Sequence, residues 1–150
     1  MKTTRSFVLS SFLFSALLLQ SVTAVAQKAK KPQKLDKRKY DIEIRETTTE
    51  GKKYEKDIFE FTAKEIISDY FEMKLKTPTM HYKTLKDSTF TDDGEEAKYY
   101  KLSASEKSAK GDENYQLELI INGKEITGTI KLMKGEAVKK SWEFEGSQNN

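Results

Sequence analysis

The stretch LELIINGKEITGTIKLMKGEAVKKSWEFEG, from Leu117 to Gly146, decides the fold class, because it contains three apolar-polar alternations separated by two turn signals. An apolar side chain at every second position places one face of a β-strand in the core and the other in water. The apolar set, which begins just before this stretch, is Tyr115, Leu117, Leu119, Ile121, Ile126, Ile130, Leu132, Val138, Trp142 and Phe144. We therefore expect three antiparallel strands that share one buried face.

Two features of this stretch concern the backbone. Asn122-Gly123 predicts a two-residue hairpin turn of type I′, in which both central residues have a positive φ. Gly128 lies inside the middle strand, which predicts a bend or the close approach of another backbone. Both features are typical of small curled sheets.

Turn signals also recur upstream, and between them lie further candidate strands. The turn signals are TTTEGKK at 47–53, KTPTM at 76–80, TDDG at 91–94 and AKGDEN at 109–114. Tyr40, Ile42 and Ile44 alternate with polar residues and predict a first strand, and 81–90 and 97–107 predict two more. Short strands between regularly spaced turns indicate an all-β meander.

Residues 54–73 have two interpretations. Phe59 and Phe61, followed by Ile66 and Tyr70, suit two strands with a turn between them. The alternative is one amphipathic helix over 54–73 with an antiparallel sheet packed on it, because Phe59, Ala63, Ile66, Tyr70 and Met73 form a helical stripe. We assign strands, because isoleucine, phenylalanine, tyrosine and threonine favour them, and the count then reaches eight.

Eight antiparallel strands joined by short turns can close into an up-and-down barrel, which removes the exposed edges of an open sheet. The pattern F-x-x-x-x-I-x-S from Phe61 to Ser68, KDST at 86–89, NGKEITGTI at 122–130 and WEFEG at 142–146 resemble small exported bacterial proteins with a lipocalin-like or calycin-like barrel. The resemblance covers most of residues 36–146. It implies the barrel fold and the binding of a small ligand or a partner, and it implies no catalytic residue.

The N-terminus is typical of a secretory signal peptide. Lys2 and Arg5 precede the apolar run at 7–19, and AVA at 24–26 is a cleavage site of the A-x-A type. The run is shorter than the roughly 20 apolar residues that span a bilayer, so we expect cleavage after Ala26 and no transmembrane segment afterwards. With no cysteine to carry a lipid anchor or a disulfide, we expect a periplasmic or secreted protein of a Gram-negative bacterium.

The charge is unevenly distributed along the chain. Residues 27–39 contain seven basic residues and one acidic residue, whereas the chain from Tyr40 onward contains 18 basic and 23 acidic residues, a net charge of −5. We interpret 27–39 as a basic flexible tail, 40–146 as one barrel domain and 147–150 as a C-terminal tail. The tail is either a solvated linker or a contact for anionic lipids, and the acidic body argues against nucleic-acid binding.

The sequence offers little to an enzyme. His81 is the only histidine and there is no cysteine, so a nucleophile-histidine site has one possible base and zinc has too few nitrogen or sulfur ligands. TDDGEE at 91–96 groups four carboxylates, but it lacks the EF-hand pattern and suits a solvated hairpin tip. We expect no enzymatic activity, no cofactor and no metal.

Aromatic residues are the remaining candidates for a binding site. The set that can line a barrel mouth and hold a ligand is Tyr40, Tyr82, Tyr100, Tyr115 and Trp142. The first hypothesis is an exported, monomeric barrel that binds a small apolar or amphipathic molecule. The alternative is an envelope interaction module, an inhibitor or accessory subunit, in which the same side chains fill a solid core.

Overall fold

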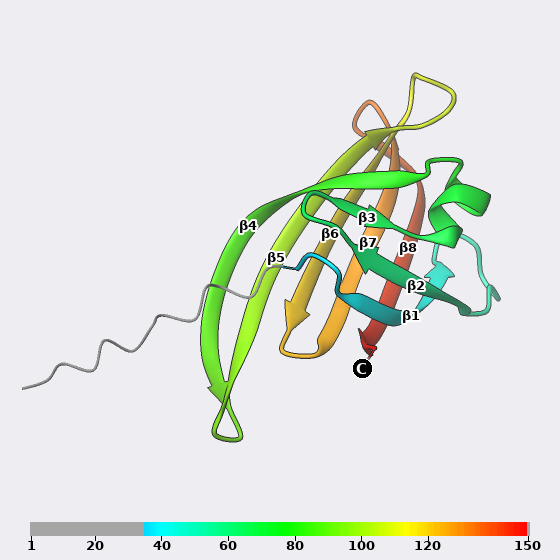
Figure 1. The fold of residues 1–150 in the computed structure, drawn as a ribbon. Helices are drawn as coiled ribbons and strands as arrows, with labels where there is room; N and C mark the ends of the chain where they lie inside the picture. Colours follow the sequence, from blue (N-terminus) through cyan, green and yellow to red (C-terminus); the bar gives the residue numbers. More distant parts are fainter. Residues whose placement is uncertain (1–34, 150) are drawn as a thin grey trace, which may run out of the picture. The chain divides into compact units, whose positions relative to one another are not determined.

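The computed structural model describes residues 35–149, and these residues form a closed antiparallel barrel (Figure 1). Each strand pairs with the next one along the chain, and β8 closes the barrel by pairing with β1. The strands are β1 (Lys39–Glu46), β2 (Glu55–Phe61), β3 (Glu65–Ile67), β4 (Thr79–Asp92), β5 (Glu95–Lys107), β6 (Asn114–Asn122), β7 (Glu125–Lys134) and β8 (Ala137–Gln148). The prediction of an eight-stranded up-and-down barrel is therefore confirmed.

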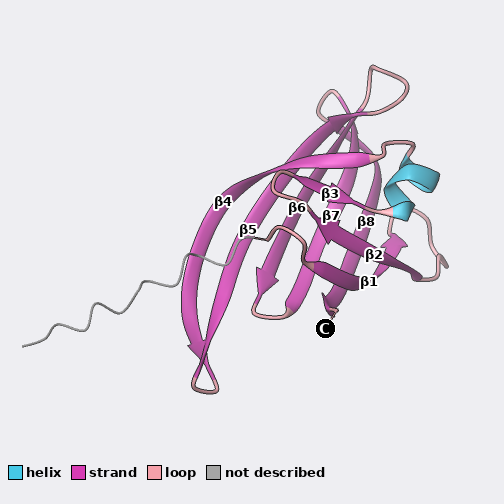
Figure 2. Cartoon of the chain, viewed as in Figure 1, coloured by secondary structure: helices cyan, strands magenta, loops and turns pink. Residues whose placement is uncertain are grey.

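Residues 54–73 contain two strands, as we assigned them, and the alternative of one helix over 54–73 is wrong. The second strand is shorter than expected, because it ends at Ile67 and Tyr70 belongs to a helical turn. β2 and β3 pair with each other, and a helical turn, η1 (Phe71–Leu75), follows them (Figure 2). Ser68 starts the turn, because its Oγ accepts a hydrogen bond from the Phe71 N–H at 3.2 Å. The left-handed backbone of Lys76, with φ +61°, ends it.

The hairpin between β6 and β7 forms where it was expected, but its turn is displaced by one residue. Asn122 is still in the ladder, opposite Glu125, so the two turn residues are Gly123 and Lys124. Only Gly123 has a positive φ, +63°, and a positive φ at the first central residue alone is typical of type II′. The expected type I′ turn at Asn122-Gly123 is therefore wrong.

Gly128 makes room for an aromatic ring from the next strand. It is paired with Phe144 on β8, and a Cβ atom at Gly128 would lie 2.5 Å from Phe144 Cζ and 2.5 Å from the Glu118 carbonyl oxygen. Both distances are far below van der Waals contact, so only glycine fits while Phe144 occupies the core. The expected close approach at Gly128 is confirmed.

Val138 does not share the buried face of Trp142 and Phe144, which corrects the expectation from their even spacing. The β7–β8 ladder shifts register, so that Leu132 is opposite Lys140 whereas Met133 is opposite Val138. The extra residue of this bulge turns the start of β8 over, and the Val138 side chain is 50% exposed. The alternation of apolar and polar residues cannot reveal such a bulge, because the bulge changes which residues point inward and leaves the sequence pattern unchanged.

Two segments without strand structure cover the ends of the core. η1 contributes Phe71 and Leu75, both buried, and the chain before β1 contributes the buried Leu35. The Lys37 N–H donates to the Phe61 carbonyl at 2.7 Å, so part of the segment interpreted as a tail is hydrogen-bonded to β2. Within residues 35–149, no helix is long and apolar enough to cross a membrane.

Candidate functional site

The five aromatic residues predicted to bind a ligand are all directed into the core, but they form two separate groups. Three of them, Tyr40, Tyr82 and Tyr100, lie near the segment Leu35–Arg38. The Phe61 ring connects the first two, at centroid distances of 5.5 Å to Tyr40 and 5.8 Å to Tyr82. The Arg38 guanidinium lies 6.0 Å from the centroid of the Tyr100 ring.

Burial controls the chemistry of these three tyrosines. It raises the pKa of Tyr40, of Tyr82 and of Tyr100, and the positive charge of Arg38 partly opposes this rise at Tyr40 and Tyr100. The hydroxyl groups therefore stay protonated at neutral pH. The Tyr82 hydroxyl already donates to the Thr62 carbonyl at 2.9 Å, which leaves it little capacity for a ligand.

Tyr115 and Trp142 form the second group, next to η1. Their ring centroids are 6.2 Å apart, and the Tyr115 hydroxyl donates to the Leu75 carbonyl at 3.0 Å. Tyr70, which precedes η1, lies against Trp142, and burial raises the pKa of Tyr70 to about 12. Tyr115 therefore contacts η1 itself, and Trp142 contacts the residue before η1.

Phenylalanine side chains fill the space between the two groups. The Phe59 centroid lies 5.0 Å from that of Phe71 and 4.9 Å from that of Phe144. All three rings are buried, and such tilted or edge-to-face contacts are typical of a packed core. The five predicted residues thus form two aromatic groups in a core that also contains these three rings.

A groove of about 880 Å³ lies on the outside of the barrel, over β1 and β2 and beside the end of β3 and the end of β8. Its apolar part is formed by Ile58 on β2 and Ile67 on β3, whose side chains are 46% and 40% exposed. Gly146 forms part of its wall, because β1 approaches so closely that a Cβ there would lie 2.1 Å from the Asp41 carbonyl oxygen. We call this site the outer groove.

The outer groove is acidic. Its charged lining consists of the carboxylates of Asp41, Glu43, Asp57, Glu60 and Asp69 and the ammonium groups of Lys39 and Lys56. Five negative groups against two positive ones leave an excess of three negative charges. Lys39 is also paired with Glu60 at 2.8 Å, so the site favours cationic groups beside its apolar pair.

A second groove, of about 590 Å³, lies at the end of the barrel that carries the β4–β5 turn. Arg38 forms one side of it and is the residue that connects it to the Tyr100 ring. Its charged lining also includes Asp92, Asp93, Glu95, Glu96, Glu125, Lys98 and Lys124. We call this site the end groove.

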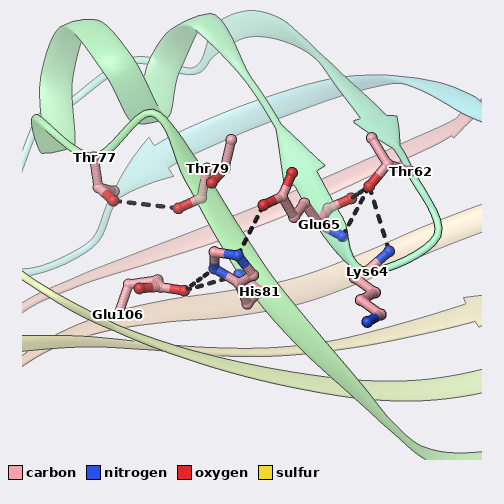
Figure 3. A network of polar contacts seen from close by, with 7 residues as sticks. All are labelled: Thr62, Lys64, Glu65, Thr77, Thr79, His81 and Glu106. Atoms are coloured by element: carbon pink, nitrogen blue, oxygen red, sulfur yellow. Dashed lines mark hydrogen bonds and ion pairs between the residues drawn. The ribbon is translucent and has the colours of Figure 1, made fainter.

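His81 belongs to a polar network on the outside of the barrel (Figure 3). Its Nε2 lies 2.8 Å from Glu65 Oε1 on β3, and its Nδ1 lies 2.6 Å from Glu106 Oε1 on β5. The hydrogen bond with Glu106 raises the pKa of His81, with a further contribution from Glu65. Because both ring nitrogens face carboxylates, the imidazolium form is favoured and a general base is not.

Among the described residues, no group of three or more His, Asp or Glu side chains is arranged so that it could hold a metal ion. The four carboxylates of TDDGEE lie at the β4–β5 turn, where Asp93 and Gly94 both have positive φ. These carboxylates lie at a hairpin tip because Asp93 and Gly94 have the backbone conformation that a two-residue hairpin turn requires.

Sequence reasoning overlooked the outer groove, although a signal for it exists. Ile58 precedes Phe59, and Ile67 follows Ile66, so each strand has an apolar pair in consecutive positions. Neighbouring residues of a strand point to opposite faces, so one member of each pair must lie outside the core. Only the fold shows that the two outer members lie in the same groove.

Comparisons of the chain with protein-family models, with curated proteins and with solved structures found no match. What the structure shows is a closed eight-stranded antiparallel barrel, which is the fold that the resemblance to lipocalin-like proteins implied.

Proposed function

We propose that this protein is an exported, non-enzymatic interaction module whose barrel core is a scaffold and whose outer groove binds a segment of a partner protein. The observation that carries the proposal is the contrast between the two faces of β2 and β3. Their inner residues, Phe59 and Ile66, are fully buried, whereas Ile58 and Ile67 remain exposed together in a groove. Exposed apolar groups inside a concave site with a polar rim are typical of a binding surface.

The charge of the outer groove identifies the class of partner. With five carboxylates and two lysines around Ile58 and Ile67, the groove suits a segment that carries apolar residues next to Lys or Arg. The groove is open along its length, so it suits an extended chain better than a compact small molecule. The partner would belong to the same compartment, the periplasm or the cell exterior.

Site-specific photo-crosslinking in the cells that produce the protein tests this proposal. A photoreactive residue at Ile58 should crosslink to one discrete partner, and Ile67→Glu in the same chain should abolish that product. Ile120 is the matched control position, because it is an exposed isoleucine on the outer face of β6, away from the groove. Equal crosslinking from 58 and 120, or none from 58, would refute the assignment of the outer groove.

Binding of a small amphipathic ligand is a second candidate, and the end groove supports it. Arg38 connects this groove to Tyr100, and Tyr40 and Tyr82 lie beside it in the core. Five carboxylates outnumber the three basic side chains of this groove, so an amphipath with a cationic head fits it, with its apolar part directed toward these rings. Calorimetric titration with dodecyltrimethylammonium tests this: binding should be saturable, and Glu96→Lys should weaken it.

A further inference from the structure

One edge of β4 is unpaired over most of its length. β3 pairs only with Thr79–His81, and the Tyr82 N–H donates to the Lys64 carbonyl at 2.9 Å. Within residues 35–149, the rest of β4, Lys83–Asp92, pairs with β5 alone. We call its unpaired side the β4 edge; β4 extends far beyond the short β3 in Figure 1. An unpaired edge is a template for another strand, because its N–H and C=O groups are free to form a ladder.

The lower part of the β4 edge is regular enough to form such a ladder. A bulge at Leu85 shifts the register between Thr84 and Lys86, and beyond it the pairing with β5 is continuous to Asp92. Side chains therefore alternate strictly along 86–92. Lys86, Ser88, Phe90 and Asp92 share one face, and Asp87, Thr89 and Thr91 share the other.

We propose that the β4 edge binds the β4 edge of a second copy of this chain, antiparallel and centred on Thr89. A twofold axis at Thr89 places Lys86 of one copy opposite Asp92 of the other. The symmetry forms two such Lys86–Asp92 pairs in the dimer. Registers that keep each residue on its own face differ by two residues, and only this one makes Lys86 and Asp92 direct neighbours. Opposite charges across a ladder stabilise it.

The remaining pairs of this register are compatible with a ladder. Asp87 is opposite Thr91 and Ser88 is opposite Phe90, so no two like charges face each other directly. Lys86 is already oriented over the Tyr99 ring, with its ammonium 5.1 Å from the centroid, which keeps the charge on the outer face of the hairpin. Threonine and phenylalanine also favour extended backbone.

The size of the contact determines the strength of the dimer. Seven residues from each copy form an interface smaller than those of stable complexes, so we expect a weak dimer that dissociates on dilution. The monomer expected from the sequence then predominates at low concentration. This inference concerns a different surface from the outer groove, so the two can fail independently.

Sedimentation equilibrium over a wide range of protein concentration tests the proposal through charge reversal. Lys86→Glu places a carboxylate opposite Asp92, and Asp92→Lys places an ammonium opposite Lys86, so each variant should raise the dimer Kd about tenfold or more. The double variant K86E/D92K restores opposite charges and should return the Kd to within about threefold of the wild type. Lys139→Glu, which reverses an exposed lysine on β8, should leave the Kd unchanged.

Residue-resolved amide exchange measured by NMR locates the contact. The amides of 86–92 that do not point toward β5 should exchange more slowly as concentration rises, whereas the amides of β6 should not change. A protein that stays monomeric at every concentration would overturn the proposal. A dimer whose Kd is changed by neither Lys86→Glu nor Asp92→Lys, or one whose protected amides lie outside β4, would overturn it as well. If the β4 amides are protected from exchange equally at every protein concentration, another segment or molecule occupies the edge and the proposal of a second copy is rejected.

Discussion

At some positions of this barrel the space beside the backbone is too small for any side chain, so a single glycine is required there. At Gly128, the nearest obstacles to a Cβ atom are the Phe144 ring and the backbone oxygen of Glu118, and the backbone oxygen cannot rotate away. A methyl group would therefore push β7 away from β6 or force Phe144 out of its buried position. Phe144 in turn contacts Phe59, so the disturbance would reach the middle of the core.

We predict that Gly128→Ala lowers the free energy of unfolding by about 1–3 kcal/mol, the usual range for an overpacked core. Urea denaturation followed by far-ultraviolet circular dichroism measures it. Thr127→Ala is the control, because Thr127 is exposed on the other face of the same strand, and it should change the free energy by no more than about 0.5 kcal/mol. A Gly128→Ala protein as stable as the wild type would mean that Phe144 does not occupy the space beside residue 128.

Elements differ in how far the sequence could predict them. The strands from 114 to 148 follow from alternation, because their inner and outer faces differ sharply in polarity. In 54–73, Phe59, Ile66 and Tyr70 are spaced to suit a helix as well as two strands, which is why this segment also matched a helix. The helical turn, the bulge that exposes Val138 and the two covering segments depend on contacts between distant parts of the chain. The five aromatic residues belong to the core or pack against it, but alternation could not show that they form two groups, because their ring contacts join distant strands.

β3 is the shortest strand, and a histidine on β4 connects it to β5. Only three residue pairs connect it to β4, and His81 on β4 links Glu65 of β3 to Glu106 of β5. The link is complete only when both ring nitrogens are protonated. Because folding raises the pKa of His81 above its ordinary value of 6.5, the folded state binds this proton more tightly than the unfolded state does. The link therefore stabilises the fold fully below the unfolded pKa and is lost as the pH rises through the folded pKa.

We predict that the urea midpoint falls in the wild type as the pH rises above 6.5 and that this fall is absent in His81→Gln. His81 is the only histidine in the chain, so no other imidazole titrates in this window. NMR titration of the His81 ring should also give a pKa above 6.5, and Glu106→Gln should lower it. The explanation fails if His81→Gln keeps the pH dependence of the wild type.

At the scale of the whole molecule, the question is whether the barrel is filled or hollow. Trp142 answers it, because it is the only tryptophan and lies buried between Tyr115 and the residues around η1. In a filled barrel its emission is blue-shifted from the start and does not respond to added amphipaths. In a hollow barrel, an entering ligand would displace water near the indole and change the emission saturably.

We predict the filled case, in which Trp142→Ala removes a large packed side chain and lowers the free energy of unfolding by about 3–5 kcal/mol. Far-ultraviolet circular dichroism must follow this unfolding, since the variant has no tryptophan. Trp142→Phe keeps an aromatic ring in the core and should cost less than Trp142→Ala, which makes it the matched control. A small loss in Trp142→Ala, together with a saturable emission change in the wild type on titration with laurate or a neutral amphipath, would show that the interior has room for a ligand. The core would then be the candidate binding site, and binding of a small amphipath would replace the interaction module as the first proposal, although Ile58 and Ile67 would still be exposed in the outer groove.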